Sequence, residues 1–297
     1  MRKVARRNSS QAEDSGGPPR GAWTSGSRGG TGVEMTAKDD ILTVEDLTLR
    51  FGGITAISQV SLQARRGRIT AIIGPNGAGK TSLLNVISGF YRPQIGRVHF
   101  MGEDLLGKPA HARARMGIAR SFQNIALFRG LTVLENIKLG AHSQLKAGIF
   151  TASAYWGPAK REEEKLTRWI DEKVIDFLRL KHVRDREIVG LPFGTQKQIE
   201  LARSLVTRPS LLLLDEPFAG MNATEKAAMA EDIRRTVDSL GTTVVLIDHD
   251  MKTLMALAEY VYVLNFGKLI AQGTPAQVQA NPMVIEAYIG APLEEAS

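Results

Sequence analysis

Apolar residues follow two patterns along this chain, and each pattern predicts a different kind of strand. Residues 42–48 and 58–64 alternate between apolar and polar positions, which is typical of strands with one buried face. These two segments are expected to pair in an antiparallel sheet. Other segments are short and almost continuously apolar, as parallel strands buried on both faces are; they are residues 69–73, 211–215, 243–247 and 260–265. The chain is therefore expected to combine an antiparallel sheet with a buried sheet.

Helical patterns fill the region between the apolar strands. Residues 131–206 are mostly helical in pattern, with an interruption from Gly148 to Gly157 that predicts a surface loop. The charged run at residues 161–165 is expected to be a solvent-exposed helix face. Near the C-terminus, residues 274–277 combine an N-cap Thr, a first-turn proline and a capping-box Gln, which predicts a short helix. Asn281-Pro282 is expected to start a final helix in the same way.

A phosphate-binding loop follows the first apolar strand. The segment from Gly74 to Thr81 fits the pattern G-x-x-x-x-G-K-[ST], with a strand before it and an amphipathic helix after it. A structural Gly-rich turn is the alternative, but this strand-loop-helix setting argues against it. Lys80 is expected to reach the β- and γ-phosphates, and the Thr81 hydroxyl to bind Mg²⁺. The candidate phosphate ligands are Gly74, Pro75, Asn76, Gly77, Ala78, Gly79, Lys80, Thr81 and Ser82.

Two adjacent acids end the four-leucine strand. Asp215 stands at its carboxyl end, where it is expected to hold Mg²⁺ or the waters bound to it. Glu216 follows directly and is expected to polarise the attacking water as a general base. The alternative is that both acids cap a following helix, which the phosphate-binding loop upstream makes the weaker interpretation.

Three further segments occur in a fixed order. Gln123 comes after a predicted strand and is placed to contact Mg²⁺ or the attacking water. Residues 191–203 form a turn that leads into a helix, and His249 ends another apolar strand, where an imidazole can reach a γ-phosphate. Each residue alone is an ordinary polar strand end. Together, and in this order, they resemble the nucleotide-binding subunit of ATP-binding cassette (ABC) transporters over about residues 41–290.

The resemblance implies an α/β fold, a P-loop NTPase of ABC type with an antiparallel β subdomain. A helical subdomain would be inserted at about residues 126–206, within a cassette domain of residues 39–297. The resemblance also implies Mg²⁺-dependent ATP hydrolysis. In that scheme the catalytic residues are Glu216, His249, Gln123 and Lys80, and the metal ligands are Thr81, Gln123 and Asp215.

Two other family positions can be matched. Phe51 corresponds to the aromatic residue that stacks on adenine, although an aromatic core residue on an edge strand is the alternative. Residues 218–222 correspond to the loop that contacts the opposite subunit, with Asn222 where many members have Asp.

The signature segment departs from the family pattern L-S-G-G-Q. Pro192 replaces the Ser whose hydroxyl binds the γ-phosphate held by the opposite subunit, and Phe193 replaces the first Gly. Gly194 is retained and is followed by Thr195-Gln196, so these three residues are the candidate contacts to the opposite nucleotide. The helix that follows still presents N–H groups and a positive dipole end to an anion. One chain would then hold half of each of two composite ATP sites.

A finer resemblance points to the ATPases of branched-chain amino acid importers. It implies integral-membrane permease subunits as partners, a second ABC ATPase subunit in a favoured heterodimer, and indirectly an extracytoplasmic solute-binding protein. The chain would lie peripherally at the cytoplasmic face of the membrane. The segments that carry this resemblance are residues 49–56, 117–128 and 284–290.

Composition leaves other classes open. The chain of 297 residues has no cysteine, and its net charge is +7, which is compatible with nucleic acid or an anionic membrane surface as a partner. No stretch approaches the roughly 20 apolar residues of a membrane helix. One rival is a soluble ABC ATPase acting on nucleic acid, a partner that we do not expect. Others are an ATPase for export or lipid transport and a regulatory cassette without catalysis, against which the retained acids and His249 argue.

The first 38 residues differ from the rest of the chain. They are rich in Gly, Ser, Pro and Arg, with six basic against three acidic residues in residues 1–34, and are expected to be a disordered basic tail. They lack the apolar core of a secretion signal. Such a tail could bind anionic lipid or nucleic acid. We favour the alternative that translation starts at Met35.

A chain that starts at Met35 is expected to keep the melting temperature, ATP binding and partner assembly of the full chain, because no apolar pattern precedes Ile41. Thermal unfolding and co-purification of both versions test this. A large drop in melting temperature or transport on truncation would show that the tail belongs to the working protein.

Overall fold

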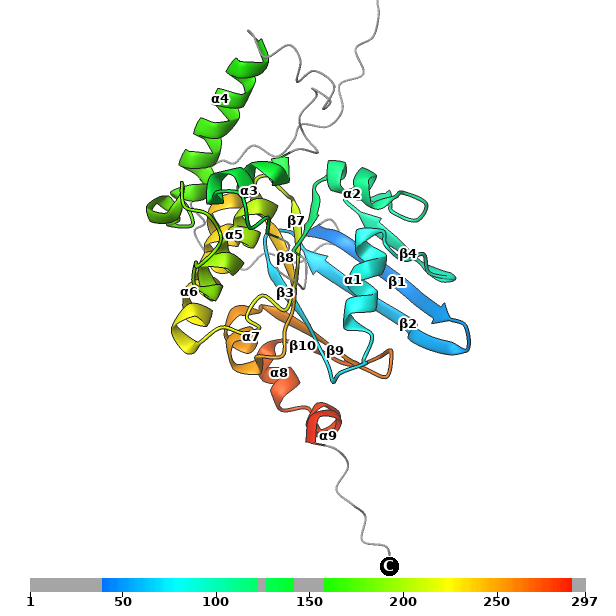
Figure 1. The fold of residues 1–297 in the computed structure, drawn as a ribbon. Coiled ribbons are helices and arrows are strands. Elements are labelled where there is room, and N and C mark those ends of the chain that lie inside the picture. The colour runs from blue at the N-terminus through cyan, green and yellow to red at the C-terminus, as the bar shows by residue number, and fades with distance from the viewer. Residues whose placement is uncertain (1–38, 122–126, 142–157, 290–297) are drawn as a thin grey trace, which may run out of the picture.

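A computed structural model describes residues 39–121, 127–141 and 158–289. Two sheets lie at its centre (Figure 1). The first is antiparallel, in the order β2-β1-β4-β5, and consists of β1 (Asp40–Phe51), β2 (Ile54–Arg65), β4 (Ile95–Phe100) and β5 (Glu103–Asp104). The second has the order β10-β9-β3-β8-β7-β6. Its strands are β3 (Ile69–Ile73), β6 (Ile118–Arg120), β7 (Leu211–Asp215), β8 (Thr243–Ile247), β9 (Tyr260–Asn265) and β10 (Lys268–Gly273).

The second sheet is parallel except for the edge strand β10, which pairs antiparallel with β9. Its central strands are buried on both faces, as their continuous apolar runs predict. Alternate side chains of β7 enter two different cores: Leu212 and Leu214 face one, and Leu211 and Leu213 face the other. Each core therefore fixes one face of the sheet. A slip of one residue in strand register would move the side chains of each face into the other core.

Helices cover both faces of this sheet (Figure 1). The antiparallel sheet and α1 share one core with one face, and the helices α5 and α6 share the other core with the opposite face. The helix α4 projects beyond the sheets. The helices are α1 (Lys80–Ser88), α2 (Ala110–Met116), α3 (Val133–Ala141), α4 (Pro158–Ile170), α5 (Phe193–Leu205), α6 (Ala223–Leu240), α7 (Met251–Leu257), α8 (Pro275–Gln279) and α9 (Pro282–Ile289).

The structure confirms the α/β class and the antiparallel subdomain. The helices α3, α4 and α5 lie in the region expected to be the helical subdomain, with a π-helical turn (Asp171–Ile175) directly after α4. The limits of that subdomain stay a prediction, because part of the region, including the loop expected at Gly148 to Gly157, lies outside the described residues. The capping box that starts α8 is confirmed, since Thr274 and Gln277 exchange side-chain and backbone hydrogen bonds.

None of the helices within the described ranges has both the length and the apolar character that crossing a bilayer requires.

Candidate nucleotide-binding site

The parallel pairing brings four carboxyl ends of strands to one edge of the sheet. The phosphate-binding loop follows β3, and its neighbour β8 leads into Asp248-His249. The next strand, β7, ends at Asp215 with Glu216 directly after it, and β6 leads into Ser121. Ligands of parallel α/β sheets bind at this edge. The structure thus brings together residues that are far apart in the sequence.

The phosphate-binding loop is fixed by close backbone packing. Gly79, the N-cap of α1, has φ 96°, and a Cβ on it would lie 2.5 Å from the carbonyl oxygen of Ala56 in β2. Only glycine fits this left-handed position without displacing backbone. Gly267, in the turn between β9 and β10, packs against the same carbonyl, donates to the carbonyl of Ala78 and accepts from the amide of Ser58.

The amino end of α1 is open to an anion. The N-cap Gly79 has no side chain to cap the helix, and the first turn contains no acidic residue. The first N–H groups of a helix have no intrahelical partner, and the helix dipole adds positive potential there. Both properties suit a phosphate.

Lys80 folds back over the loop. Its Nζ donates to the carbonyl oxygens of Gly74 at 2.7 Å and Pro75 at 2.9 Å, and the residue is buried. Burial lowers the pKa of the Lys80 ammonium, and the nearby carboxylates of Glu216 and Asp215 oppose that shift. The ammonium thus occupies the mouth of the loop, and a phosphate would have to exchange with these two carbonyl contacts.

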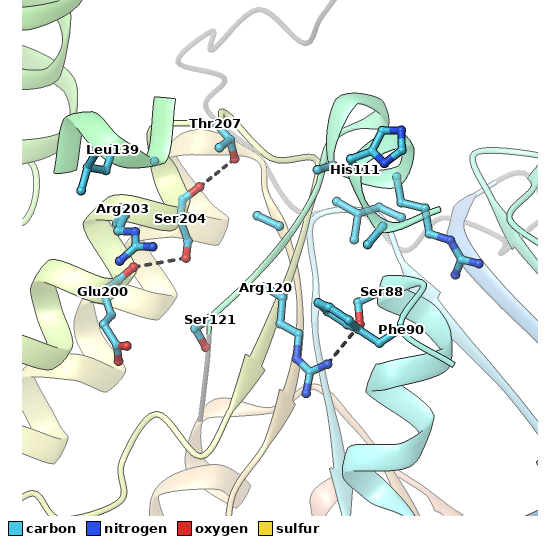
Figure 2. Close-up of a pocket in the computed structure, with 16 residues that line it drawn as sticks. Ser88, Phe90, His111, Arg120, Ser121, Leu139, Glu200, Arg203, Ser204 and Thr207 are labelled. Carbon is cyan, nitrogen blue, oxygen red and sulfur yellow. Dashed lines mark hydrogen bonds between the residues drawn. The ribbon is translucent and has the colours of Figure 1, made fainter. Parts of the chain in front are cut away.

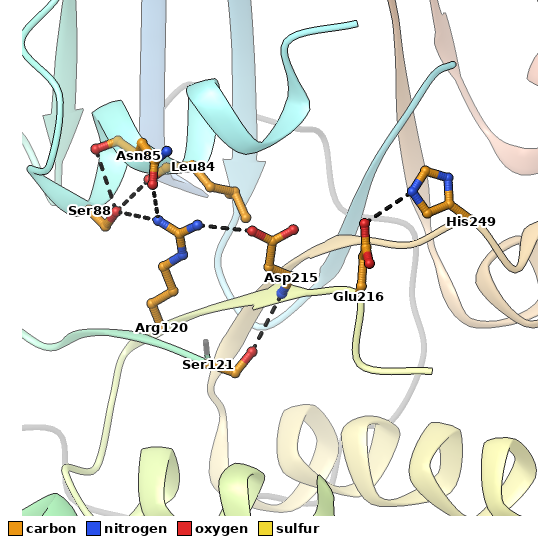
Figure 3. A network of polar contacts seen from close by, with 8 residues as sticks. All are labelled: Leu84, Asn85, Ser88, Arg120, Ser121, Asp215, Glu216 and His249. Carbon is orange, nitrogen blue, oxygen red and sulfur yellow. Dashed lines mark hydrogen bonds and ion pairs between the residues drawn. The ribbon is translucent and has the colours of Figure 1, made fainter. Parts of the chain in front are cut away.

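Asp215 is buried and half satisfied (Figure 3). Its Oδ2 accepts from Nη2 of Arg120 at 2.9 Å, while its Oδ1 has no hydrogen-bond partner. Such a free carboxylate oxygen fits a Mg²⁺ ion or its waters. Among the described residues, no group of three or more His, Asp or Glu side chains forms a metal cage. Mg²⁺ is commonly held by one or two protein ligands together with substrate phosphates, a role that the free Oδ1 of Asp215 fits.

Glu216 has a strained backbone. Its φ is 53°, in the left-handed region, and its N–H donates to the carbonyl of Ile247 at 2.8 Å. Non-glycine residues in this region cluster at functional sites. The Glu216 Oε1 lies 3.0 Å from Nε2 of His249, and both side chains are partly exposed (Figure 3). The Glu216 carboxylate thus lies beside the His249 imidazole at the end of the strand.

Asp248 joins the loops that follow β7 and β8. Its buried carboxylate accepts from the amides of Phe218 at 2.9 Å and Asp250 at 2.8 Å. Burial raises the pKa of this carboxyl, and these N–H groups oppose the shift. Asp248 therefore holds the segments of Glu216 and His249 in a fixed relation.

The signature segment lies at the start of α5, and its side chains and amides contact Leu191 directly before the helix, α6 and Gly220 in the loop before α6. The amide of Gly194 donates to Oε1 of Glu225 at 3.3 Å, and Nε2 of Gln196 donates to the carbonyl of Leu191 at 2.9 Å. Pro192 is the N-cap and makes no side-chain capping bond. Contact of Gly194, Thr195 and Gln196 with a nucleotide on an opposite chain stays a prediction.

Phe51 is not a core residue. It is 44% exposed at the end of β1, and its ring meets the edge of Tyr91 at a centroid distance of 5.0 Å. This excludes the alternative of a core aromatic, while contact with adenine stays a prediction. Gln123 lies outside the described residues.

The contacts of three residues at the site were not predicted from the sequence. Arg120 pairs with Asp215, Asp248 bridges two loops, and Glu225 accepts from Gly194. Asp248 carried a signal, since it stands beside His249 at a strand end. The other two pairings depend on strand order and on how α5 packs against α6, which a local pattern does not contain.

A groove opens beside the site (Figure 2). Its volume is about 410 Å³. Ser88, Phe90 and Arg120 form one wall, and Leu139 of α3 and Ser204 of α5 lie on the opposite side. The groove therefore separates α1 from the helical region.

Comparison with known protein families gives two matches. The family model described as "ABC transporter" matches residues 57–219. The model described as "Branched-chain amino acid ATP-binding cassette transporter" matches residues 268–293, at the C-terminal end.

Similar curated proteins span nearly the same length. The high-affinity branched-chain amino acid transport ATP-binding protein LivG of Salmonella typhimurium is 41% identical over 254 residues, which are 84% of this chain and 98% of LivG. The corresponding protein BraF of Pseudomonas aeruginosa is 39% identical over the same shares.

Two solved structures have the same fold. A nucleotide-free ATP-binding cassette from an ABC transporter has 31% identity and a TM-score of 0.74, covering 84% of this chain and 99% of its own. An ATP-binding cassette in its ADP conformation has 32% identity, the same TM-score and the same coverage.

The loop of His249 gives a pH-dependent prediction through its neighbour Asp250. The carboxylate of Asp250 pairs with Lys226 and caps α7 by accepting from Thr253, and these bonds lower its pKa to about 2. A carboxyl whose pKa is lower in the folded state stabilises the fold at pH values above its unfolded pKa. This contribution is lost as the pH falls toward the folded pKa.

Asp250→Asn keeps a capping oxygen but removes the charge. We expect it to lower the free energy of unfolding by about 1 kcal/mol at pH 7, after allowance for solvent screening. Urea denaturation should show a smaller difference at pH 3.5 than at pH 7. An equal difference at both pH values would contradict this assignment.

Proposed function

Because this chain belongs to the ABC transporter ATP-binding proteins of the branched-chain amino acid type, we propose that it hydrolyses ATP to power an importer of branched-chain or related amino acids. One observation carries the catalytic part of this proposal. The open amino end of α1, Lys80 and the adjacent acids Asp215 and Glu216 meet at one edge of a parallel sheet.

The phosphate-binding loop would bind the nucleotide phosphates. The first N–H groups of α1 would donate to the anion, and Lys80 would exchange its two carbonyl contacts for phosphate oxygens. Phe51, exposed at the end of β1, would stack on the adenine. These residues bind and orient ATP, which is most of what phosphoryl transfer requires of a protein.

Glu216 would act as the general base. Its carboxylate is held by His249 at a strand end and can accept a proton from a water placed against the γ-phosphate. His249 would orient that carboxylate and contact the γ-phosphate. Thr81, Gln123 and Asp215 are the residues that would hold Mg²⁺, which neutralises phosphate charge when bound.

The complete site would need a second cassette. We assign Gly194, Thr195 and Gln196 to the nucleotide of an opposite subunit, as the resemblance of this segment to the family signature implies; within its own chain the segment contacts α6. ATP would hold the two subunits together, and hydrolysis would let them separate.

The groove beside the site is the surface that we assign to the permease subunits. It separates α1 from α3 and α5, and Ser121 in its wall directly precedes the segment of Gln123. A permease segment in this groove would contact both the catalytic core and the helical region. The chain would then lie at the cytoplasmic face of the membrane, held there by its partners.

Glu216→Gln tests the base. The amide keeps the size of the side chain but cannot accept the proton, so ATP binding should persist while turnover nearly disappears and a closed dimer accumulates. Steady-state hydrolysis and size-exclusion chromatography with ATP measure both effects. Hydrolysis at the wild-type rate would show that Glu216 is not the base.

Lys80→Ala is the matched contrast. It removes a charge directed at the phosphates, so it should weaken ATP binding itself. A titration with ATP separates this loss from the turnover defect of Glu216→Gln.

The signature of this chain predicts an asymmetric pair. Pro192 has no hydroxyl for a γ-phosphate, so this chain should complete the weaker of two ATP sites over a partner ATPase with a standard signature. We expect the mixed pair to hydrolyse ATP faster per subunit than the chain alone. Equal rates would favour a homodimer instead.

Pro192→Ser supplies the missing hydroxyl and should raise the rate of the weaker site. The helix N–H groups and dipole already attract the anion. An unchanged rate would mean that these groups are sufficient.

A further inference from the structure

Arg120 lies between the groove and the proposed magnesium site. It is the last residue of β6, and its side chain is 12% exposed. Its Nη1 donates to Oδ1 of Asn85 at 2.5 Å and to Oγ of Ser88 at 3.1 Å, both on α1. Its Nη2 donates to Oδ2 of Asp215 at 2.9 Å. One planar group therefore joins α1 to the end of β7 (Figure 3).

The same guanidinium forms part of the groove wall. Its central carbon lies 5.9 Å from the centre of the Phe90 ring, and Ser88, Phe90 and Arg120 all line the groove (Figure 2). The Nε of Arg120 is buried without a hydrogen-bond partner, as is Oδ1 of Asp215. Neither group is fully satisfied by the other, so each retains capacity for a further partner.

We propose that Arg120 competes with magnesium for the carboxylate of Asp215, and that its place in the groove wall makes the magnesium site sensitive to what the groove holds. This inference rests on the proposed function. Arg120 is a positioning residue, because it acts on the nucleotide only through Asp215.

The charges give the direction of the effect. Asp215 is fully buried, and a buried carboxylate left without a counter-charge is strongly unfavourable. Arg120 supplies that charge when no metal is bound. A magnesium ion on the same carboxylate would be a second cation at short range, and the two repel each other strongly in a partly buried site. Arg120 should therefore weaken magnesium binding.

The groove is coupled to the magnesium site through Arg120. A carboxylate or carbonyl oxygen of a permease segment beside Phe90 would accept from the guanidinium and reduce its hold on Asp215. Magnesium nucleotide would then bind more tightly. Coupling of two binding events is reciprocal, so magnesium binding should also alter the groove wall.

The first experiment measures binding and not activity. The dissociation constant of N-methylanthraniloyl-ADP is determined in EDTA and in excess Mg²⁺ for the full chain and its variants. The dissociation constant in EDTA divided by that in excess Mg²⁺ reports how strongly magnesium strengthens nucleotide binding. In Arg120→Met this ratio should rise about tenfold, which is about 1.4 kcal/mol of coupling. A merely structural role would leave it unchanged.

Two further variants make the result decisive. Arg120→Lys keeps a cation in the buried position, which guards against loss of the fold, and should raise the ratio by about threefold because an ammonium lacks the planar fork. Arg184→Met is the control, since Arg184 pairs with Asp171 after α4, and it should leave the ratio unchanged.

An unchanged or lowered ratio in the Arg120 variants would overturn the competition. If the wild-type chain failed to bind the nucleotide at all, the proposed function would fail instead.

The second experiment tests the groove. The chain has no cysteine, so His111→Cys, at the exposed rim of the groove, gives a single site for an environment-sensitive dye. Adding Mg²⁺ to the ADP-bound protein should change the dye emission, and Arg120→Met should remove most of that change. An identical change with and without Arg120 would show that the groove and the magnesium site are not linked through this residue.

Discussion

The parallel pairing of β3, β8, β7 and β6 is the constraint on which the site depends. Apolar side chains on both faces of these strands bury the sheet between two cores, and the parallel direction places all four carboxyl ends at one edge. Polar residues directly after the strands are therefore close in space although they are far apart in the sequence. Catalytic geometry here is a consequence of strand order and register.

Much of the site could be predicted from the sequence, because its chemistry lies in short segments. The phosphate-binding loop, Asp215-Glu216 and His249 each stand beside an apolar strand, and the structure places them at one edge. The left-handed backbone of Glu216 could not be predicted, since no glycine or turn motif marks it and its N–H bonds to Ile247 on a strand that is distant in the sequence. The Arg120–Asp215 pair could not be predicted either, because it depends on the alignment of β6 with β7.

Several charged and polar groups of the site already have partners within the chain. Lys80 binds two carbonyls of its own loop, Arg120 balances Asp215, and Glu225 accepts from the amide of Gly194. A nucleotide with its metal would replace contacts of this kind and would not simply enter an open space. Affinity therefore depends on the difference between two sets of interactions, and residues outside the phosphate-binding loop can adjust it.

The turn between β9 and β10 has a consequence for which molecules fit. Gly267 packs on the carbonyl of Ala56, bonds to Ser58 of β2 and bonds to Ala78 of the phosphate-binding loop. The sheet that bears Phe51 and the loop for the phosphates are thereby joined at a fixed spacing. In the proposed binding mode, in which Phe51 stacks on the base, this fixed spacing would make the site select its ligand by the length from base to phosphate. A shorter or longer molecule could engage one end but not both.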